Sequence, residues 1–151
     1  MWQAGKRPRV LVADGDEDAL TQTALRLGRA GYEVLVARDG EEALARAAAE
    51  APDLCLIDAM TPKLTGYDVT RRLRADPRTS DVPVLLMTAQ AQHRRPDGPD
   101  RVAYLPKPCS PRALRAGVSA ALAQNAPRRI STAGTVFNRI TRSSATDQRS
   151  R

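Results

Sequence analysis

The chain has 151 residues, 42% of them hydrophobic and only 3% aromatic, so it can fold as one domain with an aliphatic core. It contains no apolar run long enough to cross a membrane, and its start, MWQAGKRPR, lacks the apolar region of a signal peptide. We therefore expect a soluble, cytoplasmic protein. The net charge of +7 looks like a signal for nucleic-acid binding until it is divided along the chain, since most of it belongs to the last residues.

Five short apolar segments, rich in leucine and β-branched residues, are predicted to be buried strands. They cover residues 9–13, 32–37, 54–57, 82–87 and 102–105. Their alternation with longer amphipathic segments indicates a parallel sheet with helices on both faces and right-handed crossovers.

The amphipathic segments repeat apolar residues at helical spacing. The first ends at Gly31, the second begins after Asp39, and the third covers 67–75. The last has Ser110 as its N-cap and Pro111 at its first position. The side chains expected to face the core are Leu20, Ala24, Leu27, Ala43, Leu44, Ala47, Ala48, Val69, Leu73, Leu114, Val118 and Leu122.

The segment between the fourth and fifth strands departs from this pattern. Pro96, Gly98 and Pro99 should shorten or break a helix there. His93, the single histidine, is expected to be a neutral surface residue. The two cysteines, Cys55 and Cys109, lack metal-binding spacing, which favours reduced structural thiols over a disulfide or a zinc site.

Chemistry-bearing residues follow four of the five strands, and the carboxyl ends of parallel strands share one edge of a sheet. Asp14, Asp58, Thr88 and Lys107 hold these positions. A single aspartate after a strand is more often a helix cap or loop acid, but the agreement of four strand ends favours a site.

The expected chemistry is phosphoryl transfer. Asp58 is the candidate nucleophile, Thr88 and Lys107 can bind phosphoryl oxygens, and Mg²⁺ would neutralise the clustered carboxylates.

Three stretches carry a family resemblance: RVLVADGDEDAL, the block from PDLCLIDAMTPKLTGYDV to PVLLMTA, and YLPKP. They resemble the signatures of the receiver domain of two-component response regulators, of the CheY-like kind, over residues 9–124. The resemblance implies an α/β, flavodoxin-like (βα)5 fold with the strand order 2-1-3-4-5. It also implies that Asp58 accepts phosphate from a histidine kinase or phosphotransfer protein in a Mg²⁺-dependent step, and that the domain signals by protein contacts and is not an enzyme.

The same resemblance assigns roles to single residues. Asp14, Asp58 and the backbone carbonyl of Met60 would bind the metal. Thr88 and Tyr104 would be switch residues, and Lys107-Pro108 would be a cis peptide. The face that dimerises or meets partners in this family includes the helix that the prolines should break, so the oligomeric state stays open.

Gly15 is a departure from the family, because it stands where a second, metal-binding acid is usual. Asp16, one residue later, is a candidate substitute in the loop that glycine permits. Two interpretations follow: a receiver with weaker Mg²⁺ binding, or a pseudo-receiver that acts only as an interaction module.

The predicted domain organisation is a flexible segment over 1–8, a receiver domain over 9–125, and a basic, disordered tail over 126–151 that is too short for an output domain. Six arginines and one aspartate give the tail a charge of +5, against 18 basic and 16 acidic residues before it. The tail could contact nucleic acid or an acidic partner. It shows no recognition motif, however, so a solvated extension is the favoured interpretation.

Overall fold

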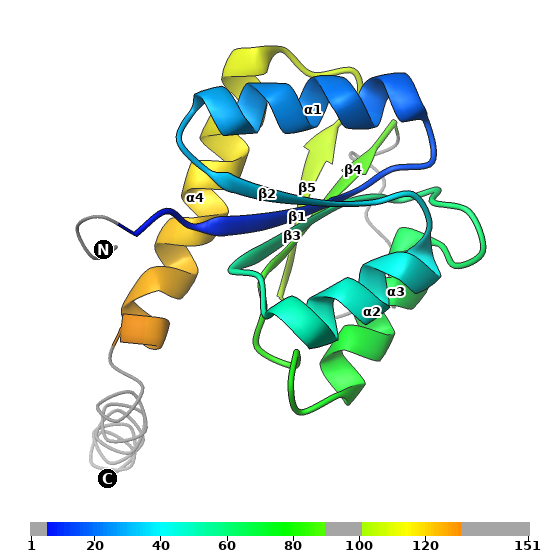
Figure 1. Cartoon of the computed structure of the whole chain (residues 1–151), viewed down its shortest axis with the longest axis vertical. Coiled ribbons are helices and arrows are strands. Elements are labelled where there is room, and N and C mark those ends of the chain that lie inside the picture. Colours follow the sequence, from blue (N-terminus) through cyan, green and yellow to red (C-terminus); the bar gives the residue numbers. More distant parts are fainter. Residues whose placement is uncertain (1–5, 90–100, 131–151) are drawn as a thin grey trace, which may run out of the picture.

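The computed structural model describes residues 6–89 and 101–130, with the backbone alone from 124 onward. Its single sheet has five parallel strands in the order β2-β1-β3-β4-β5 (Figure 1). The strands are β1 (Arg9–Ala13), β2 (Glu33–Ala37), β3 (Leu54–Asp58), β4 (Val84–Thr88) and β5 (Val102–Pro106). The predicted flavodoxin-like architecture and strand order are confirmed.

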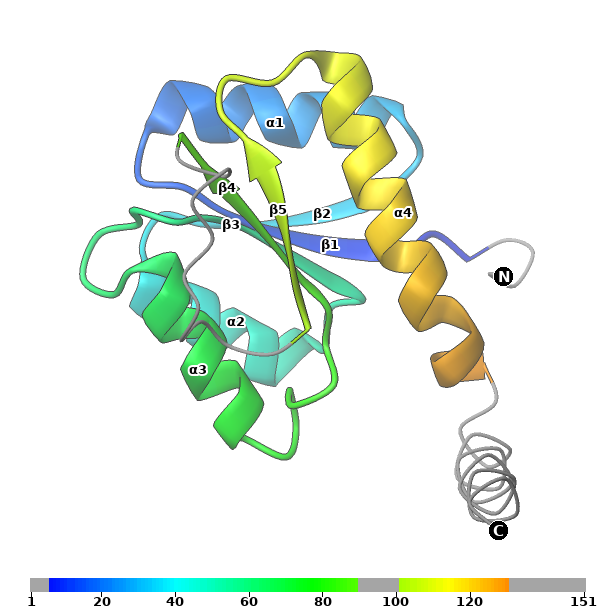
Figure 2. The ribbon, with the colours of Figure 1, turned by 180° about the vertical axis from the view of Figure 1, so that it is seen from behind.

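Helices cover both faces of the sheet. They are α1 (Glu17–Arg29), α2 (Gly40–Glu50), α3 (Gly66–Ala75) and α4 (Pro111–Ile130). Helices α1 and α4 lie on one face, and α2 and α3 on the other (Figures 1 and 2). Within the described ranges, no helix is long and apolar enough to cross a membrane.

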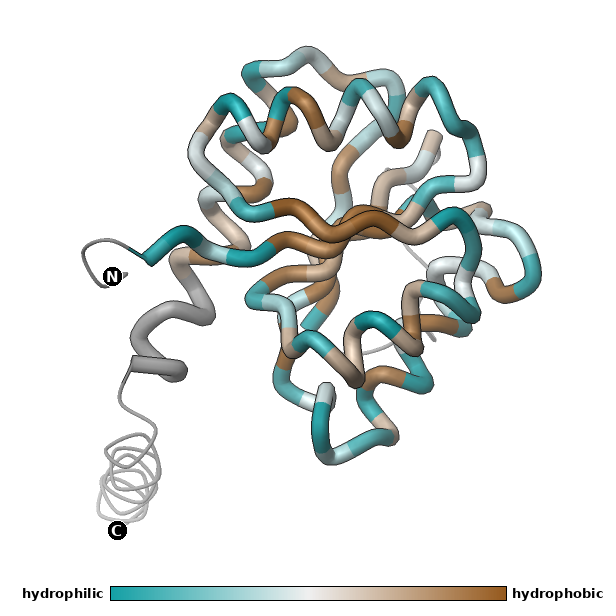
Figure 3. The backbone as a smooth tube through the Cα atoms, viewed as in Figure 1, coloured by the Kyte–Doolittle hydropathy of each residue, from teal (hydrophilic) through white to brown (hydrophobic). Residues whose placement is uncertain are grey.

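Two hydrophobic clusters form the core, one on each face of the sheet. Strand β1 shows why: Val10 and Val12 belong to the cluster under α1 and α4, whereas Leu11 and Ala13 belong to the cluster under α2 and α3. Since successive side chains of a strand point to opposite faces, a strand covered on both sides must be apolar throughout. Figure 3 shows this as hydrophobic colour along the central strands.

Side-chain caps fix where the helices begin. Asp39 accepts a hydrogen bond from the Glu42 amide at 2.8 Å, which starts α2. Thr65 and Asp68 form a capping box at α3. Ser110 accepts a hydrogen bond from the Ala113 amide at 3.0 Å, which confirms the predicted N-cap of α4. These caps pair amide groups that have no partner inside a helix.

The element ends that differ from the sequence expectations include the start of β4 and the end of α4. Strand β4 begins at Val84 and not at residue 82, which fits with Pro83, a residue that has no amide hydrogen for a strand ladder. Helix α4 runs to Ile130 and crosses the predicted domain boundary at 125. A helix anchored by buried side chains such as Leu122 gains one backbone hydrogen bond for each further residue, so it can continue past its packed part.

Several predictions fall on residues outside the described ranges. These are the short or broken helix with His93, Pro96, Gly98 and Pro99, the flexible start over 1–5, and the tail over 131–151.

Both cysteines are free thiols, as predicted. Cys55 is fully buried in β3, and this burial raises the pKa of its thiol to about 12. Cys109 is half-buried, and burial raises its thiol pKa as well. A thiol that stays protonated and buried is chemically inert, which agrees with a structural role for Cys55.

Candidate functional site

The four residues predicted from the strand ends lie together at the carboxyl edge of the sheet. Asp14 follows β1, Asp58 ends β3, Thr88 ends β4, and Lys107 follows β5. The backbone amide of Lys107 donates to the Thr88 carbonyl at 3.0 Å, which continues the β4–β5 ladder up to the site. The peptide bond between Lys107 and Pro108 is cis, as expected.

Lys107 lies between Asp14, which is buried, and Asp58, which is half-buried. Its Nζ atom is 3.1 Å from Asp58 Oδ2 and 3.8 Å from Asp14 Oδ2. The exposed fraction of the side chain is 3% for Asp14, 15% for Asp58 and 34% for Lys107. Two carboxylates therefore share one ammonium group in a partly enclosed site that solvent still reaches.

The electrostatics of the site favour an additional cation. Burial raises the pKa of Asp14, and the neighbouring Asp58 charge raises it further, although a hydrogen bond from the Asp16 amide opposes the shift. Burial lowers the pKa of Lys107, but the hydrogen bond to Asp58 and the two carboxylate charges outweigh it and leave that pKa raised. One ammonium therefore does not remove the cost of holding two carboxylates here.

The position of Asp58 depends on a close approach between β3 and α3. The Met60 amide donates to Asp58 Oδ1 at 3.1 Å. Gly66, the first residue of α3, lies so close that a Cβ atom would come within 2.8 Å of the Asp58 carbonyl oxygen. Only glycine fits at this contact, so residue 66 helps to set the end of the strand that carries Asp58.

The structure places Asp16 at the start of α1. Its Oδ1 atom accepts hydrogen bonds from the Asp18 amide at 2.9 Å and the Ala19 amide at 3.2 Å, which makes it the N-cap of α1. The acids Glu17 and Asp18 follow in the first turn. The run of acids at the start of an amphipathic segment was the signal for this cap.

The carboxylates of Asp14 and Asp58 are suitable ligands for Mg²⁺. Over the part of the chain that the structure describes, no three Asp, Glu, His or Cys side chains converge on one point, so Asp14, Asp16 and Asp58 do not form a three-carboxylate set. Asp14 and Asp58 provide two carboxylates whose mutual repulsion Lys107 offsets only in part, since the pKa of Asp14 stays raised. Magnesium is commonly bound through one or two carboxylates and several waters, so this pair suits it.

The two candidate switch residues lie on neighbouring strands. Thr88 is buried at the end of β4, and Tyr104 is half-buried in β5. Tyr104 pairs with Leu86, and Thr88 pairs with Pro106. Since Thr88 and Leu86 are two residues apart, Thr88 and Tyr104 lie on the same face of the sheet, diagonally across the two strands.

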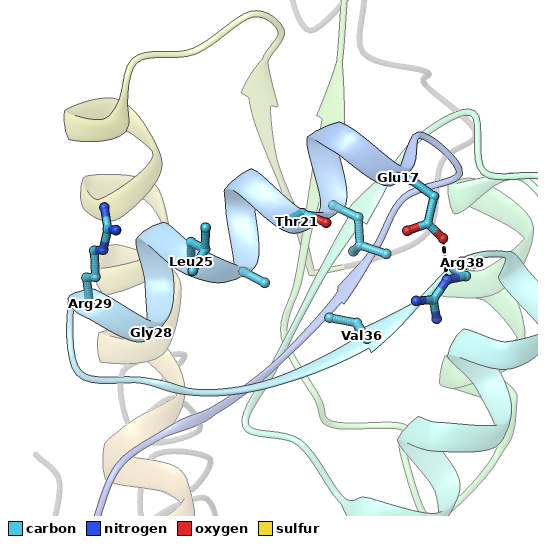
Figure 4. A pocket seen from close by; sticks show the side chains of 9 residues that line it. Glu17, Thr21, Leu25, Gly28, Arg29, Val36 and Arg38 are labelled. Atoms are coloured by element: carbon cyan, nitrogen blue, oxygen red, sulfur yellow. Dashed lines mark hydrogen bonds and ion pairs between the residues drawn. The ribbon is translucent and has the colours of Figure 1, made fainter.

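A groove lies along α1 and the edge strand β2 (Figure 4). Its volume is about 460 Å³. Leu25, which is 52% exposed, Gly28 and Val36 contribute to its mostly apolar lining, and an ion pair between Glu17 and Arg38 lies at one end. The sequence analysis did not predict this groove. The feature of the sequence that could have indicated it is a small residue, Gly28, on the same helix as an exposed leucine.

Sequence comparisons identify related proteins. The sequence model of the response regulator receiver domain matches residues 10–119. The alkaline phosphatase synthesis transcriptional regulatory protein PhoP of Bacillus subtilis is 39% identical over 122 residues, covering 76% of this chain and 48% of PhoP. The DNA-binding dual master transcriptional regulator RpaA of Synechocystis is 44% identical over 85 residues, covering 56% of this chain and 35% of RpaA. The chain thus spans about half or less of these relatives.

Solved structures agree with this relationship. The chemotaxis response regulator CheY4 of Vibrio cholerae aligns with a TM-score of 0.69 and 26% identity, over 77% of this chain and 99% of CheY4. The receiver domain of the sensor histidine kinase PA1611 from Pseudomonas aeruginosa, solved with a magnesium ion in its active-site cleft, aligns with a TM-score of 0.71 and 25% identity. It covers 78% of this chain and 99% of that domain. The chain therefore belongs to the response regulator receiver domain family of two-component systems.

Proposed function

We propose that this receiver domain accepts a phosphoryl group on Asp58 from a histidine kinase or a phosphotransfer protein. The observation that carries the proposal is the contact of 3.1 Å between Lys107 Nζ and Asp58 Oδ2, with the buried Asp14 beside it. A carboxylate held next to an ammonium group at the end of a central strand is placed to attack phosphorus and to have the incoming charge balanced.

In this mechanism an Asp58 oxygen forms a bond to phosphorus while the bond from phosphorus to the donor's histidine nitrogen breaks. The nitrogen keeps the electron pair, and the product on this chain is an acyl phosphate. Lys107 places positive charge beside the oxygens of the transferred group, as phosphoryl transfer requires. Asp14, Asp58 and the Met60 carbonyl would hold Mg²⁺, which supplies further charge neutralisation when bound.

The output would follow from a local change at the adjacent strands. A phosphoryl group on Asp58 would attract the Thr88 hydroxyl, and the space that Thr88 leaves would admit the Tyr104 ring. Their shared face of the sheet supports this coupling. Tyr104→Ala should then uncouple partner binding from phosphorylation and leave phosphorylation of Asp58 intact. Equal partner affinity of the wild type with and without phosphate would contradict the coupling.

The test of phosphorylation is intact-mass analysis after incubation with acetyl phosphate and Mg²⁺. The wild type should gain one phosphoryl mass, and the gain should disappear in Asp58→Asn and in the presence of a chelator. Lys107→Gln removes the ammonium charge. We expect this variant to fold and to be phosphorylated at least about tenfold more slowly than the wild type.

A specific observation favours one second candidate, the pseudo-receiver: Gly15 provides no carboxylate, and Asp16 is engaged as a helix cap. A folded wild type that gains no phosphoryl mass at saturating Mg²⁺ would support this alternative and reject the first proposal. Circular dichroism on the same samples confirms that the protein is folded.

We also propose which kind of partner the described domain meets. PhoP and RpaA are named as a transcriptional regulatory protein and a DNA-binding regulator, and this chain aligns with a part of each. We propose that the described domain itself meets protein partners, because its basic and acidic residues nearly balance before residue 126.

A further inference from the structure

We propose that the groove along α1 and β2 binds α1 of a second copy of this chain, in an antiparallel arrangement that forms a weak dimer. The proposal rests on an exposed leucine, on open space beside it, and on the opposite charges at the two ends of α1. It goes beyond the proposed function and does not depend on phosphorylation of Asp58.

Leu25 is the first of these observations. It lies on α1 and lines the groove, and 52% of it is exposed. Thr21, four residues earlier, and Gly28, three residues later, line the same groove, as expected for neighbours on one side of a helix. Other residues of α1, such as Leu27, are buried in the core. A helix that only covers a sheet carries polar residues on its outer side, so an exposed leucine beside an apolar groove indicates a contact surface.

The groove is open to another helix. Its volume is about 460 Å³, and Val36 of β2 faces α1 across it (Figure 4). A Cβ built on Gly28 meets nothing within 4 Å, so a second helix can approach the backbone of α1 closely at this point. Strand β2 is at the edge of the sheet, so no other described strand lies beyond it. Side chains of a second copy can therefore enter the groove from solvent.

Charge complementarity selects a second copy as the occupant. The first turn of α1 is acidic, with Glu17 and Asp18, and its last turn is basic, with Arg26 and Arg29. Figure 4 shows Glu17 and Arg29 at opposite ends of the groove. An antiparallel second α1 brings the acidic turn of each copy next to the basic turn of the other. The basic end of this chain is a poorer occupant, because the charged residues that line the groove, Glu17, Arg29 and Arg38, carry a net positive charge.

The same charges fix the register of the two helices. In an antiparallel pair in which Glu17 faces Arg29 of the second copy, Thr21 faces Leu25 of the second copy. Both contacts occur twice, because a two-fold pair uses the same surface on each copy. Each Leu25 then lies against the groove of the other copy. The arrangement closes as a dimer and does not extend into a larger assembly.

The contact is small, which makes the dimer weak. Helix α1 has 13 residues and is therefore about 20 Å long. Two helices of this length bury less than about 1,200 Å², the lower end for stable complexes. Exposed ion pairs add little attraction, so they set the orientation while the apolar contact of Leu25 supplies most of the affinity. We expect a dissociation constant on the order of 100 μM.

The test is sedimentation equilibrium of the full chain at protein concentrations up to about 1 mM, without Mg²⁺ or a phosphate donor. The variants are Leu25→Gln, Arg29→Glu and Glu17→Arg. Arg72→Glu is the matched control, because Arg72 is also an exposed arginine in the last turn of a helix, but on the other face of the sheet. Glu17→Arg also loses the ion pair with Arg38, so Tm is measured to show that each variant is folded. The NMR shifts of backbone amides on dilution locate the contact.

We expect the wild type and Arg72→Glu to dimerise equally. Leu25→Gln, Arg29→Glu and Glu17→Arg should each weaken the dimer at least about tenfold, because each substitution occurs twice in it. An equimolar mixture of Arg29→Glu and Glu17→Arg should recover an affinity within about threefold of the wild type, since every acid then faces a base again. The amides that shift on dilution should lie in α1 and β2.

Three outcomes overturn the proposal. The first is a wild type that stays monomeric at the highest concentration. The second is a dimer that Leu25→Gln leaves unchanged, or a mixture that associates no better than its two components. The third is a monomer whose α1 amides shift when residues 131–151 are removed, which would assign the groove to the chain's own basic end.

Discussion

At the scale of single residues, Asp14 has two opposite effects. Its carboxylate is buried beside Asp58, and burial is the main reason that its pKa is raised above the ordinary value of 3.8. In the folded state the group therefore holds its proton more tightly than in the unfolded chain, and stability falls as the pH rises through this interval. The same charge is what a divalent cation would bind, so the residue favours function at the expense of the fold.

We expect Asp14→Asn to stabilise the metal-free protein by about 1 kcal/mol at pH 7 and to weaken Mg²⁺ binding. The asparagine oxygen can still accept the hydrogen bond from the Asp16 amide. The measurement is urea unfolding of both proteins at pH 7 and pH 4, with and without Mg²⁺.

The gain from this substitution should shrink as the pH falls through the raised pKa of Asp14, because the wild-type carboxyl is then protonated and equally neutral. A gain that is the same at both pH values would show that the carboxylate charge is not its cause.

At the scale of elements, two glycines differ in the space that surrounds them. Gly28 lies in α1, and a Cβ there meets nothing within 4 Å. Gly66 begins α3, and a Cβ there would meet Asp58 O, Leu86 Cδ2 and Ala59 Cα at 2.8, 2.8 and 2.9 Å. The first glycine weakens its helix, whereas the second permits helix and strand to meet beside Asp58.

We predict that Gly28→Ala stabilises the protein by about 0.5–1 kcal/mol, since alanine has less freedom to lose on folding. Gly66→Ala should destabilise it by about 1–3 kcal/mol, because the backbone at Asp58 must shift. Chemical denaturation measures both. Equal and small effects of the two substitutions would contradict the tight contact at Gly66.

The limits of sequence reasoning also appear at this scale. The five strands and the order of the site residues were predictable, because buried parallel strands are short apolar runs and their carboxyl ends share an edge. The role of Asp16 was predictable in principle from local capping signals. The groove along α1 and β2 was not, because its lining residues come from two segments of the chain and only the packing of the helix beside the edge strand brings them together.

At the scale of the whole molecule, α4 separates the site from the basic end of the chain. The strands carry Asp14 and Asp58 at their carboxyl ends, whereas the last described turn of α4 lies towards the amino ends of the strands (Figures 1 and 2). The described part of the chain therefore ends on the side of the domain away from Asp58. Charge that is exposed and distant by more than about 10 Å is largely screened at ordinary salt.

A chain that ends at Ile130 should for this reason be phosphorylated on Asp58 to the same extent as the full chain, under the same acetyl phosphate and Mg²⁺ conditions. The comparison requires matched Tm values, which show that the shorter chain is folded. A large change in phosphorylation would indicate that the last 21 residues reach the site or its loops.

Removal of the same residues should have its main effect on binding to polyanions. After residue 125 the chain carries a charge of +5, and no recognition motif accompanies it. We expect the full chain to bind duplex DNA weakly and equally for unrelated sequences, with affinity that falls as salt rises on a log–log slope no steeper than about −5. The chain that ends at Ile130 keeps two of the six arginines, so its binding should be weaker and less dependent on salt. Gel shifts over a salt series measure both. A preference for one DNA sequence that is lost on truncation would contradict this expectation and assign the basic end a specific role.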